Sequence, residues 1–317
     1  MDPLSTKLLQ SWSFAPGIIA SLISVAGLYL RGWMTLRQRA PHRFGVGQLV
    51  AFQSGLLTLF LALSSPLHAL ADILLQAHML QHILLMMVAP PLIWLGAPFL
   101  PLLRGLPSWG GRRWIGLAFT WSGVRRIGAV ILHPLACWGS FVISTLAWHT
   151  PTLYELALHS KLWHEAEHVC FLGTALLFWW PVIQPWPSRP CWPQWTMIPY
   201  LFLADVQNTV LSAFLMFSER ILYPTYAAAP RVWGISALDD QIAAGAIMWA
   251  PGSLLFLVAV GALVMRLLDA PQTHAVRTIG GLPSGAMEAV ASEQVGWGVG
   301  QKCERGVTGS SSGKCFE

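Results

Sequence analysis

The chain has 317 residues, of which 55% are hydrophobic and only 10% are charged, and its mean hydropathy is +0.55. Soluble domains carry about 25% charged residues, so this composition excludes an ordinary soluble enzyme and indicates an integral membrane protein. The net charge of +5 does not indicate a nucleic-acid partner, because the basic residues lie between the apolar runs. The five cysteines form no CxxC pair, so neither a zinc knuckle nor a disulfide scaffold is expected.

Seven apolar runs are long enough to cross a bilayer as helices, which takes about 20 residues each. They cover residues 15–31, 46–64, 72–95, 128–148, 162–184, 196–217 and 240–268. The expected fold class is therefore all-α, a polytopic bundle of seven transmembrane helices within residues 1–270. Pro90 and Pro91 in the third run are expected to kink or break its helix. Residues 271–317, rich in Gly, Ser and small polar side chains, are expected to form a disordered cytoplasmic tail.

The basic residues predict the orientation of this bundle. Alternate connecting segments and the C-terminal tail together hold fifteen of the nineteen Lys and Arg residues, and the opposite side holds only Lys7, Lys161, Arg220 and Arg231. Cytoplasmic segments carry the excess of Lys and Arg. The N-terminus is therefore expected outside and the C-terminus in the cytoplasm.

The last two runs contain polar and small residues. Asp205, Gln207 and Asn208 give the sixth run a polar face, which is expected to point into the bundle. The sequence leaves open whether Asp205 relays protons or pairs with another bundle residue. Gly245 and Gly252 in the seventh run favour close helix packing rather than chemistry.

Five of the ten histidines fall at one depth, in the outer half of the expected bundle. His78 and His82 lie about 9 and 15 Å below the outer end of the third span, at 1.5 Å per residue. His149 ends the fourth span, and His164 and His168 lie in the first two turns of the fifth. Each pair is spaced i, i+4, so its two imidazoles share one helix face. Ionisable groups inside a span are functional candidates, and this shared depth predicts a metal site.

Neutral imidazoles suit copper, zinc, iron and nickel, although each histidine could instead only hydrogen-bond to a neighbouring helix. Asp240, at the start of the seventh span, either binds metal or orients a ligating histidine, or it is a helix-terminal carboxylate stabilised by the helix dipole. Met79, Met86 and Met87 are additional candidates as thioether ligands for Cu(I). Met248 lies at a similar depth in the seventh span, and His68 is close to the same rim. The expected metal site is His78, His82, His149, His164, His168 and Asp240.

Two other functions stay open from the residues alone. His164-Glu165-x-x-His168 is a literal HExxH, which supplies two zinc ligands and a general base in zinc proteases. That chemistry needs a third ligand, for which Asp239 or Asp240 is available, so zinc is the alternative metal. A haem-binding membrane cytochrome is the other alternative, although a haem takes one ligand per side and two i, i+4 pairs fit this poorly.

Four longer blocks contain these residues in a fixed order: HMLQHILLMMVAPPLIWLGAP, AWHTPTLYELAL, LWHEAEHVCFLGTALLFWWPVI and DDQIAAGAIMWAPGS. Together they resemble the CtaG-type cytochrome c oxidase assembly proteins, over about residues 15–268. The resemblance implies a seven-helix, non-enzymatic protein of the bacterial plasma (inner) membrane that handles copper, as Cu(I), for the copper B centre of haem-copper oxidase. The implied partners are oxidase subunit I or other assembly factors. The polar positions carried over by motif are His78, His82, His149, His164, His168 and Asp240.

Overall fold

A computed structural model describes residues 10–107, 121–188 and 192–279, with the side chains of 270–279 excepted. Contacts divide the chain into two units, Met1–Leu267 and Leu268–Glu317, and the account below concerns the first. Residues 280–317, most of the expected tail, lie outside the described residues.

The regular structure of the described residues is helical throughout. In chain order the elements are α2 Pro16–Arg39, α3 Val46–Ser64, α4 Pro66–Ala71, α5 Leu75–Ile83, the π turn η1 Leu84–Val88, α6 Ala89–Leu95, α7 Phe99–Gly105, α9 Ser122–Ile131, α10 Pro134–Trp148, α11 Pro151–His159, α12 Lys161–Ile183, the 3-10 turn η2 Gln194–Thr196, α13 Met197–Met216, α14 Pro224–Ala228 and α15 Ala237–Ile279.

The all-α prediction is confirmed for the described residues, and these contain six helical stretches long and apolar enough to cross a membrane. The predicted fourth span is bent: α9 and α10 meet at 59°, and counting them as one span gives seven. The bend precedes Pro134, which begins α10, because a helix is disfavoured at the residue before proline. The described residues thus supply six candidate membrane spans, or seven if the bent pair is one span, as expected of a multi-pass membrane protein.

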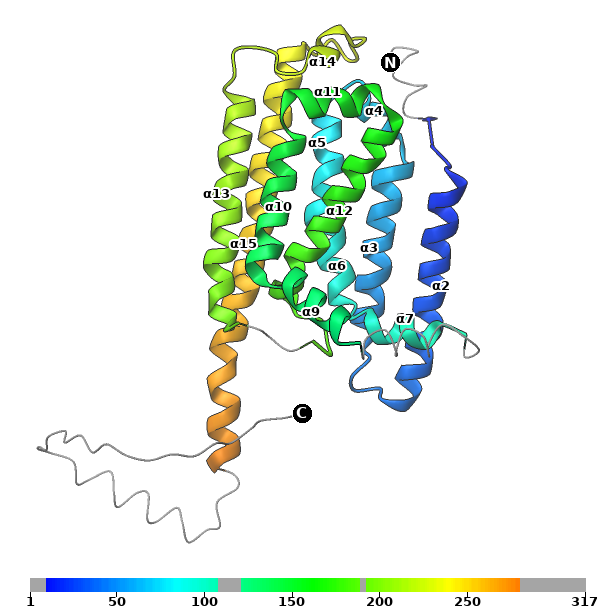
Figure 1. Ribbon diagram of the computed structural model, residues 1–317, viewed down its shortest axis with the longest axis vertical. Helices are drawn as coiled ribbons and strands as arrows, with labels where there is room; N and C mark the ends of the chain where they lie inside the picture. Colours follow the sequence, from blue (N-terminus) through cyan, green and yellow to red (C-terminus); the bar gives the residue numbers. More distant parts are fainter. Residues whose placement is uncertain (1–9, 108–120, 189–191, 280–317) are drawn as a thin grey trace, which may run out of the picture. The chain divides into compact units, whose positions relative to one another are not determined.

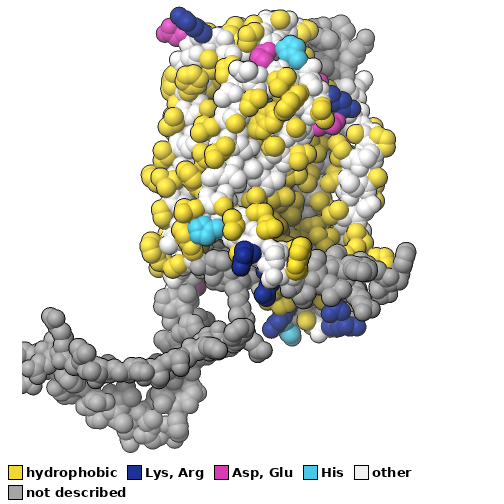
Figure 2. Space-filling model, in the orientation of Figure 1, with side chains coloured by type: hydrophobic (Ala, Val, Ile, Leu, Met, Phe, Trp, Pro, Cys, Tyr) yellow, Lys and Arg dark blue, Asp and Glu magenta, His cyan; other side chains and the backbone are white. Residues whose placement is uncertain are grey.

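Three short helices, α4, α11 and α14, lie at one end of the long helices (Figure 1). Each immediately precedes a long helix, so the first turns of α5, α12 and α15 are at this same end. Figure 2 shows hydrophobic side chains over the middle of the visible face and charged side chains near its ends, as expected for a bundle crossing a bilayer. The predicted outer location of this end rests on the Lys and Arg pattern.

The helix that carries the first histidine pair does not break at its two prolines. Instead α5, η1 and α6 continue as one stretch, Leu75–Leu95. Pro90 has no N–H to donate to the carbonyl of Met86 four residues earlier. The indole Nε1 of Trp179 in α12 donates to that carbonyl instead, at 3.0 Å. Of the two expected outcomes the break is therefore wrong, because a π turn and an indole from α12 accommodate the prolines, and the kink stays a prediction.

The polar face of α13 lies against α15. The hydroxyl of Ser253 donates to the Asp205 carboxylate at 2.7 Å, and Asn208 Nδ2 donates to a backbone carbonyl of α15 at 3.1 Å. Asp205 thus pairs within the bundle, one of the two roles that the sequence left open. A Cβ at Gly245 would lie 2.8 Å from the Cβ of Met216, which confirms that this glycine permits close helix packing.

Candidate metal centre

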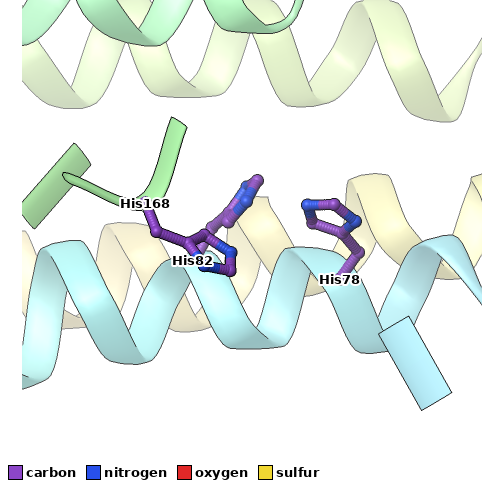
Figure 3. Close-up of side chains that lie close together, drawn as sticks. All are labelled: His78, His82 and His168. Carbon is purple, nitrogen blue, oxygen red and sulfur yellow. The ribbon is translucent and has the colours of Figure 1, made fainter. Parts of the chain in front are cut away.

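Four of the predicted histidines form one cluster between α5 and α12. His78 and His82 project from α5 into the same space as His168 from α12 (Figure 3). The ring centroids of His78 and His164 are 5.4 Å apart, and those of His82 and His168 are 6.0 Å apart. Two sets of three ligand atoms lie within 4.8 Å of one another: His78, His82 and His168, and His78, His164 and Glu167. We call His78, His82, His164, His168 and Glu167 the outer cluster.

Glu167 lies at the centre of the outer cluster and was missed by the sequence analysis. Its side chain is fully buried, with one carboxylate oxygen 3.7 Å from His78 Nε2 and the other 3.7 Å from His82 Nε2. Neither oxygen has a hydrogen-bond partner among the residues that the structure describes. An isolated ionised carboxylate is very costly to bury, so this group requires a cation or a proton beside it.

A tyrosine fixes which nitrogen of His78 faces the outer cluster. The hydroxyl of Tyr226 in α14 donates to the carbonyl of Ala71 at 2.8 Å and lies 2.9 Å from His78 Nδ1. Burial raises the pKa of Tyr226 well above its usual value, so the phenol keeps its proton. Because that proton goes to a carbonyl, which only accepts, His78 Nδ1 must donate to the hydroxyl. The Nε2 lone pair of neutral His78 is therefore free and faces Glu167.

Four more ring nitrogens of the outer cluster are without hydrogen bonds among the described residues. Both nitrogens of His82, and Nε2 of His164 and of His168, are buried atoms that lack a partner among the described residues. Leaving a buried polar atom unsatisfied costs about 1–3 kcal/mol. Several unpartnered buried nitrogens in one place require an explanation, and a role as metal ligands is a direct one.

His149 lies beside the outer cluster rather than in it. Its ring centroid is 6.1 Å from that of His82, and its Nδ1 donates to the carbonyl of Thr145 at 2.7 Å. A carbonyl only accepts, so the Nε2 of neutral His149 carries a lone pair, and this atom is buried without a partner. It lines a separate small cavity, together with Met79 and Met248.

His68 lies at the rim, as expected, with its ring stacked at 5.6 Å on that of His164. The amide Nε2 of Gln81 donates to the carbonyl of Ala62 at 2.8 Å and lies 3.2 Å from His68 Nδ1. An amide nitrogen only donates, so His68 Nδ1 accepts and the proton of the neutral ring is on Nε2. His68 therefore presents no free lone pair in this structure.

Asp240 lies at the N-terminus of α5 and not among the ligand atoms of the outer cluster. Its two carboxylate oxygens accept from the backbone N–H groups of Leu75 and Gln76, at 2.7 and 3.1 Å. These N–H groups belong to the first turn of a helix and have no partner within it. Asp240 thus caps the helix that carries His78 and His82. Metal ligation by Asp240 stays a prediction.

The comparisons with known proteins now decide the family. The family model described as cytochrome c oxidase caa3 assembly factor (Caa3_CtaG) matches residues 27–270, a range that contains the whole outer cluster. The chain belongs to the Caa3_CtaG family. The resemblance in the four sequence blocks is thereby confirmed.

Curated relatives of this Caa3_CtaG member come from mycobacteria. The chain is 28% identical over 273 residues to uncharacterized proteins of Mycobacterium bovis and Mycobacterium tuberculosis, covering 83% of this chain and 40% of each relative. It is 27% identical over 290 residues to an uncharacterized protein of Mycobacterium leprae, covering 87% of this chain and 42% of the relative. The chain therefore spans about two-fifths of the length of these relatives. No solved structure matches it.

The protease alternative gains no support from the geometry of this Caa3_CtaG member. Glu165, the expected general base, has a side chain that is 63% exposed and lies 3.8 Å from Lys161. Asp239 is exposed and accepts from the hydroxyl of Ser236, and Asp240 caps α5. The haem alternative is not supported either, because the ligand atoms form two compact groups of three that share His78, which fits a small ion better than a macrocycle.

Proposed function

We propose that this Caa3_CtaG member binds Cu(I) at the outer cluster and hands it to the copper B centre of the oxidase, acting as a metallochaperone without enzymatic activity. The observation that carries the proposal is the buried, unpartnered carboxylate of Glu167 between two imidazole nitrogens. The Nε2 lone pair of neutral His78 faces a carboxylate oxygen at 3.7 Å. Two electron-rich atoms so placed favour a cation between them.

The charge of the outer cluster favours a monovalent ion. Its four imidazoles are neutral as metal ligands, and Glu167 supplies one negative charge. A single Cu(I) ion brings this buried site to zero net charge, whereas Zn(II) would leave one positive charge in a low-dielectric interior, where uncompensated charge is costly. In this arrangement the imidazoles coordinate the ion and Glu167 compensates its charge.

The accessibility of the outer cluster suits a carrier better than a structural metal site. His78 and His82 are buried, but His164 and His168 are partly exposed and His68 stacks beside them. A partly exposed edge allows a ligand of the oxidase to replace these imidazoles one at a time. Subunit I of the oxidase, which holds the copper B centre, is the proposed recipient, directly or through another assembly factor.

The first test compares two glutamates two residues apart on α12. The purified protein is loaded with Cu(I) in the presence of a competing chelator, and the affinity is measured for the parent, Glu167→Gln and Glu165→Gln. Loss of the buried charge is expected to lower the affinity at least about tenfold, comparable to the loss of an outer-sphere partner. Glu165→Gln, which changes an exposed side chain, is expected to match the parent.

Copper in the parent no higher than in a sample without added copper would refute the proposal. Equal affinity in Glu167→Gln and the parent would also refute the assigned role of Glu167. The protease alternative predicts the reverse ranking, bound zinc and an inactive Glu165→Gln variant. Delivery is tested in cells that lack the gene, where Glu165→Gln but not Glu167→Gln should restore copper B in the oxidase.

A further inference from the structure

A cavity that His82 helps to line adjoins the outer cluster. It is a small cavity of about 30 Å³. The lining residues that matter here come from α5, η1, α10 and α15: Met79, His82, Met86, Met87, His149 and Met248. A cavity needs about 10–15 Å³ to hold one water molecule, so this one has room for a small ion.

The lining is unusually rich in sulfur. Four of the ten methionines in the chain line this one cavity. Met79 and Met248 are both buried and belong to a small hydrophobic cluster distinct from the main core, which contains Met86 and Met87. The π turn η1 contains Met86 and Met87, and π turns inside α-helices are frequent at functional sites. Thioethers are soft ligands that select Cu(I).

Two histidines that line the cavity each have a ring nitrogen without a hydrogen-bond partner among the described residues. The Nε2 of His149 has no hydrogen bond, because the Nδ1 of this ring already donates to Thr145. The Nδ1 of His82 is unpartnered as well, whereas the Nε2 of the same ring lies 3.7 Å from Glu167. His82 therefore belongs to the outer cluster and also lines the cavity. The amide of Gln207, also in the lining, has neither its oxygen nor its nitrogen satisfied.

We propose that this cavity is a second Cu(I) site, ligated by methionine sulfur and by His149, and joined to the outer cluster through His82. The inference rests on the proposed function, because it takes the same ion as cargo. The two sites differ in chemistry. The outer cluster offers nitrogen ligands and a negative charge, whereas this cavity, which we call the inner cavity, offers sulfur and neutral nitrogen ligands. The inner site would hold Cu(I) in a neutral lining, away from the partly exposed edge at His164 and His168.

The test replaces sulfur without changing side-chain volume much. Met79→Leu combined with Met248→Leu is compared with Met197→Leu, a buried methionine of the main core that does not line the cavity. Leucine and methionine exchange in cores usually costs less than about 1.5 kcal/mol, so these variants are expected to fold. Each protein is loaded with Cu(I) alone, and the copper content and the X-ray absorption spectrum are measured.

The parent and Met197→Leu are expected to bind about two Cu(I) ions per chain, with a copper–sulfur component in the absorption spectrum. The double variant, which keeps Met86 and Met87 in the lining, should bind about one ion and lose most of the sulfur component. The reciprocal variant, Glu167→Gln with His164→Ala, should retain the sulfur component. About one ion per chain in the parent, with nitrogen and oxygen ligands only, would overturn the second site and leave the proposed function intact. Absence of bound copper from every variant would overturn both.

Discussion

Replacing Tyr226 by phenylalanine separates the positioning of His78 from the general stability of the bundle. The substitution removes the hydroxyl that accepts from His78 Nδ1 at 2.9 Å and donates to the carbonyl of Ala71 at 2.8 Å. Both partners are then left without this bond, at about 1–3 kcal/mol each, or roughly 2–6 kcal/mol in total before any relaxation. The freed imidazole can also rotate or take up its other tautomer.

The metal affinity should fall as well. Removing the outer-sphere partner of a ligating histidine typically costs about 10–100-fold in affinity, which corresponds to about 1.4–2.8 kcal/mol. We expect Tyr226→Phe to lower the Cu(I) affinity by this factor, measured by competition with a chromophoric chelator. Thermal unfolding in detergent measures the accompanying loss of stability.

The matched control is Tyr200→Phe. The Tyr200 hydroxyl also donates to a backbone carbonyl, that of Phe178, at 2.9 Å, but it lies in the main core and contacts no residue of the outer cluster. The control should lose stability, at about 1–3 kcal/mol for one orphaned carbonyl, and keep its copper affinity. Equal copper affinities in Tyr226→Phe and Tyr200→Phe would refute the reasoning that Tyr226 orients a ligand.

Two further predictions concern the helices that support the site. Asp240→Ala removes the acceptor at the N-terminus of α5 and should lower stability by about 0.5–2 kcal/mol in thermal unfolding. Asp239→Ala removes an exposed carboxylate that accepts from the Ser236 hydroxyl, and it should lower stability less. Equal melting temperatures of the two variants would contradict the capping role of Asp240. Gly245→Ala places a Cβ 2.8 Å from Met216 in α13 and should lower the free energy of unfolding by about 1–3 kcal/mol. Gly261→Ala on the same helix meets open space and should leave that free energy unchanged or raise it. A Gly245→Ala protein as stable as the parent would show that α13 and α15 can separate without cost.

The sequence predicted both histidine pairs of the site but could not choose between its two glutamates. At about 100° per residue, Glu165 and Glu167 lie about 80° to either side of the midpoint between His164 and His168 on a helical wheel. The HExxH pattern drew attention to Glu165, yet the structure buries Glu167 and exposes Glu165. The choice depends on which flank of α12 packs against α5, and that is a property of the tertiary structure.

The expected depth of a residue in the membrane was a useful but incomplete guide to which residues share a site. It grouped His149 and Asp240 with the two pairs, and the structure places both near them. However, depth says nothing about lateral position, and laterally His149 lines the inner cavity while Asp240 reaches the start of α5. The sequence also offered Asp240 as a helix-terminal carboxylate for its own helix. Its actual partners are the N–H groups of Leu75 and Gln76, 165 and 164 residues away in the chain.

The indole that hydrogen-bonds to the carbonyl left free by Pro90 has a consequence for the geometry of the proposed metal site. Trp179 Nε1 donates from α12 to the carbonyl of Met86, and Trp94 Nε1 donates from α6 to the carbonyl of Leu176 in α12. These two bonds join the helices that carry the histidine pairs at points further along the bundle. They fix the spacing of the two histidine pairs in the absence of an ion, so that the proposed binding of copper would lose little conformational entropy.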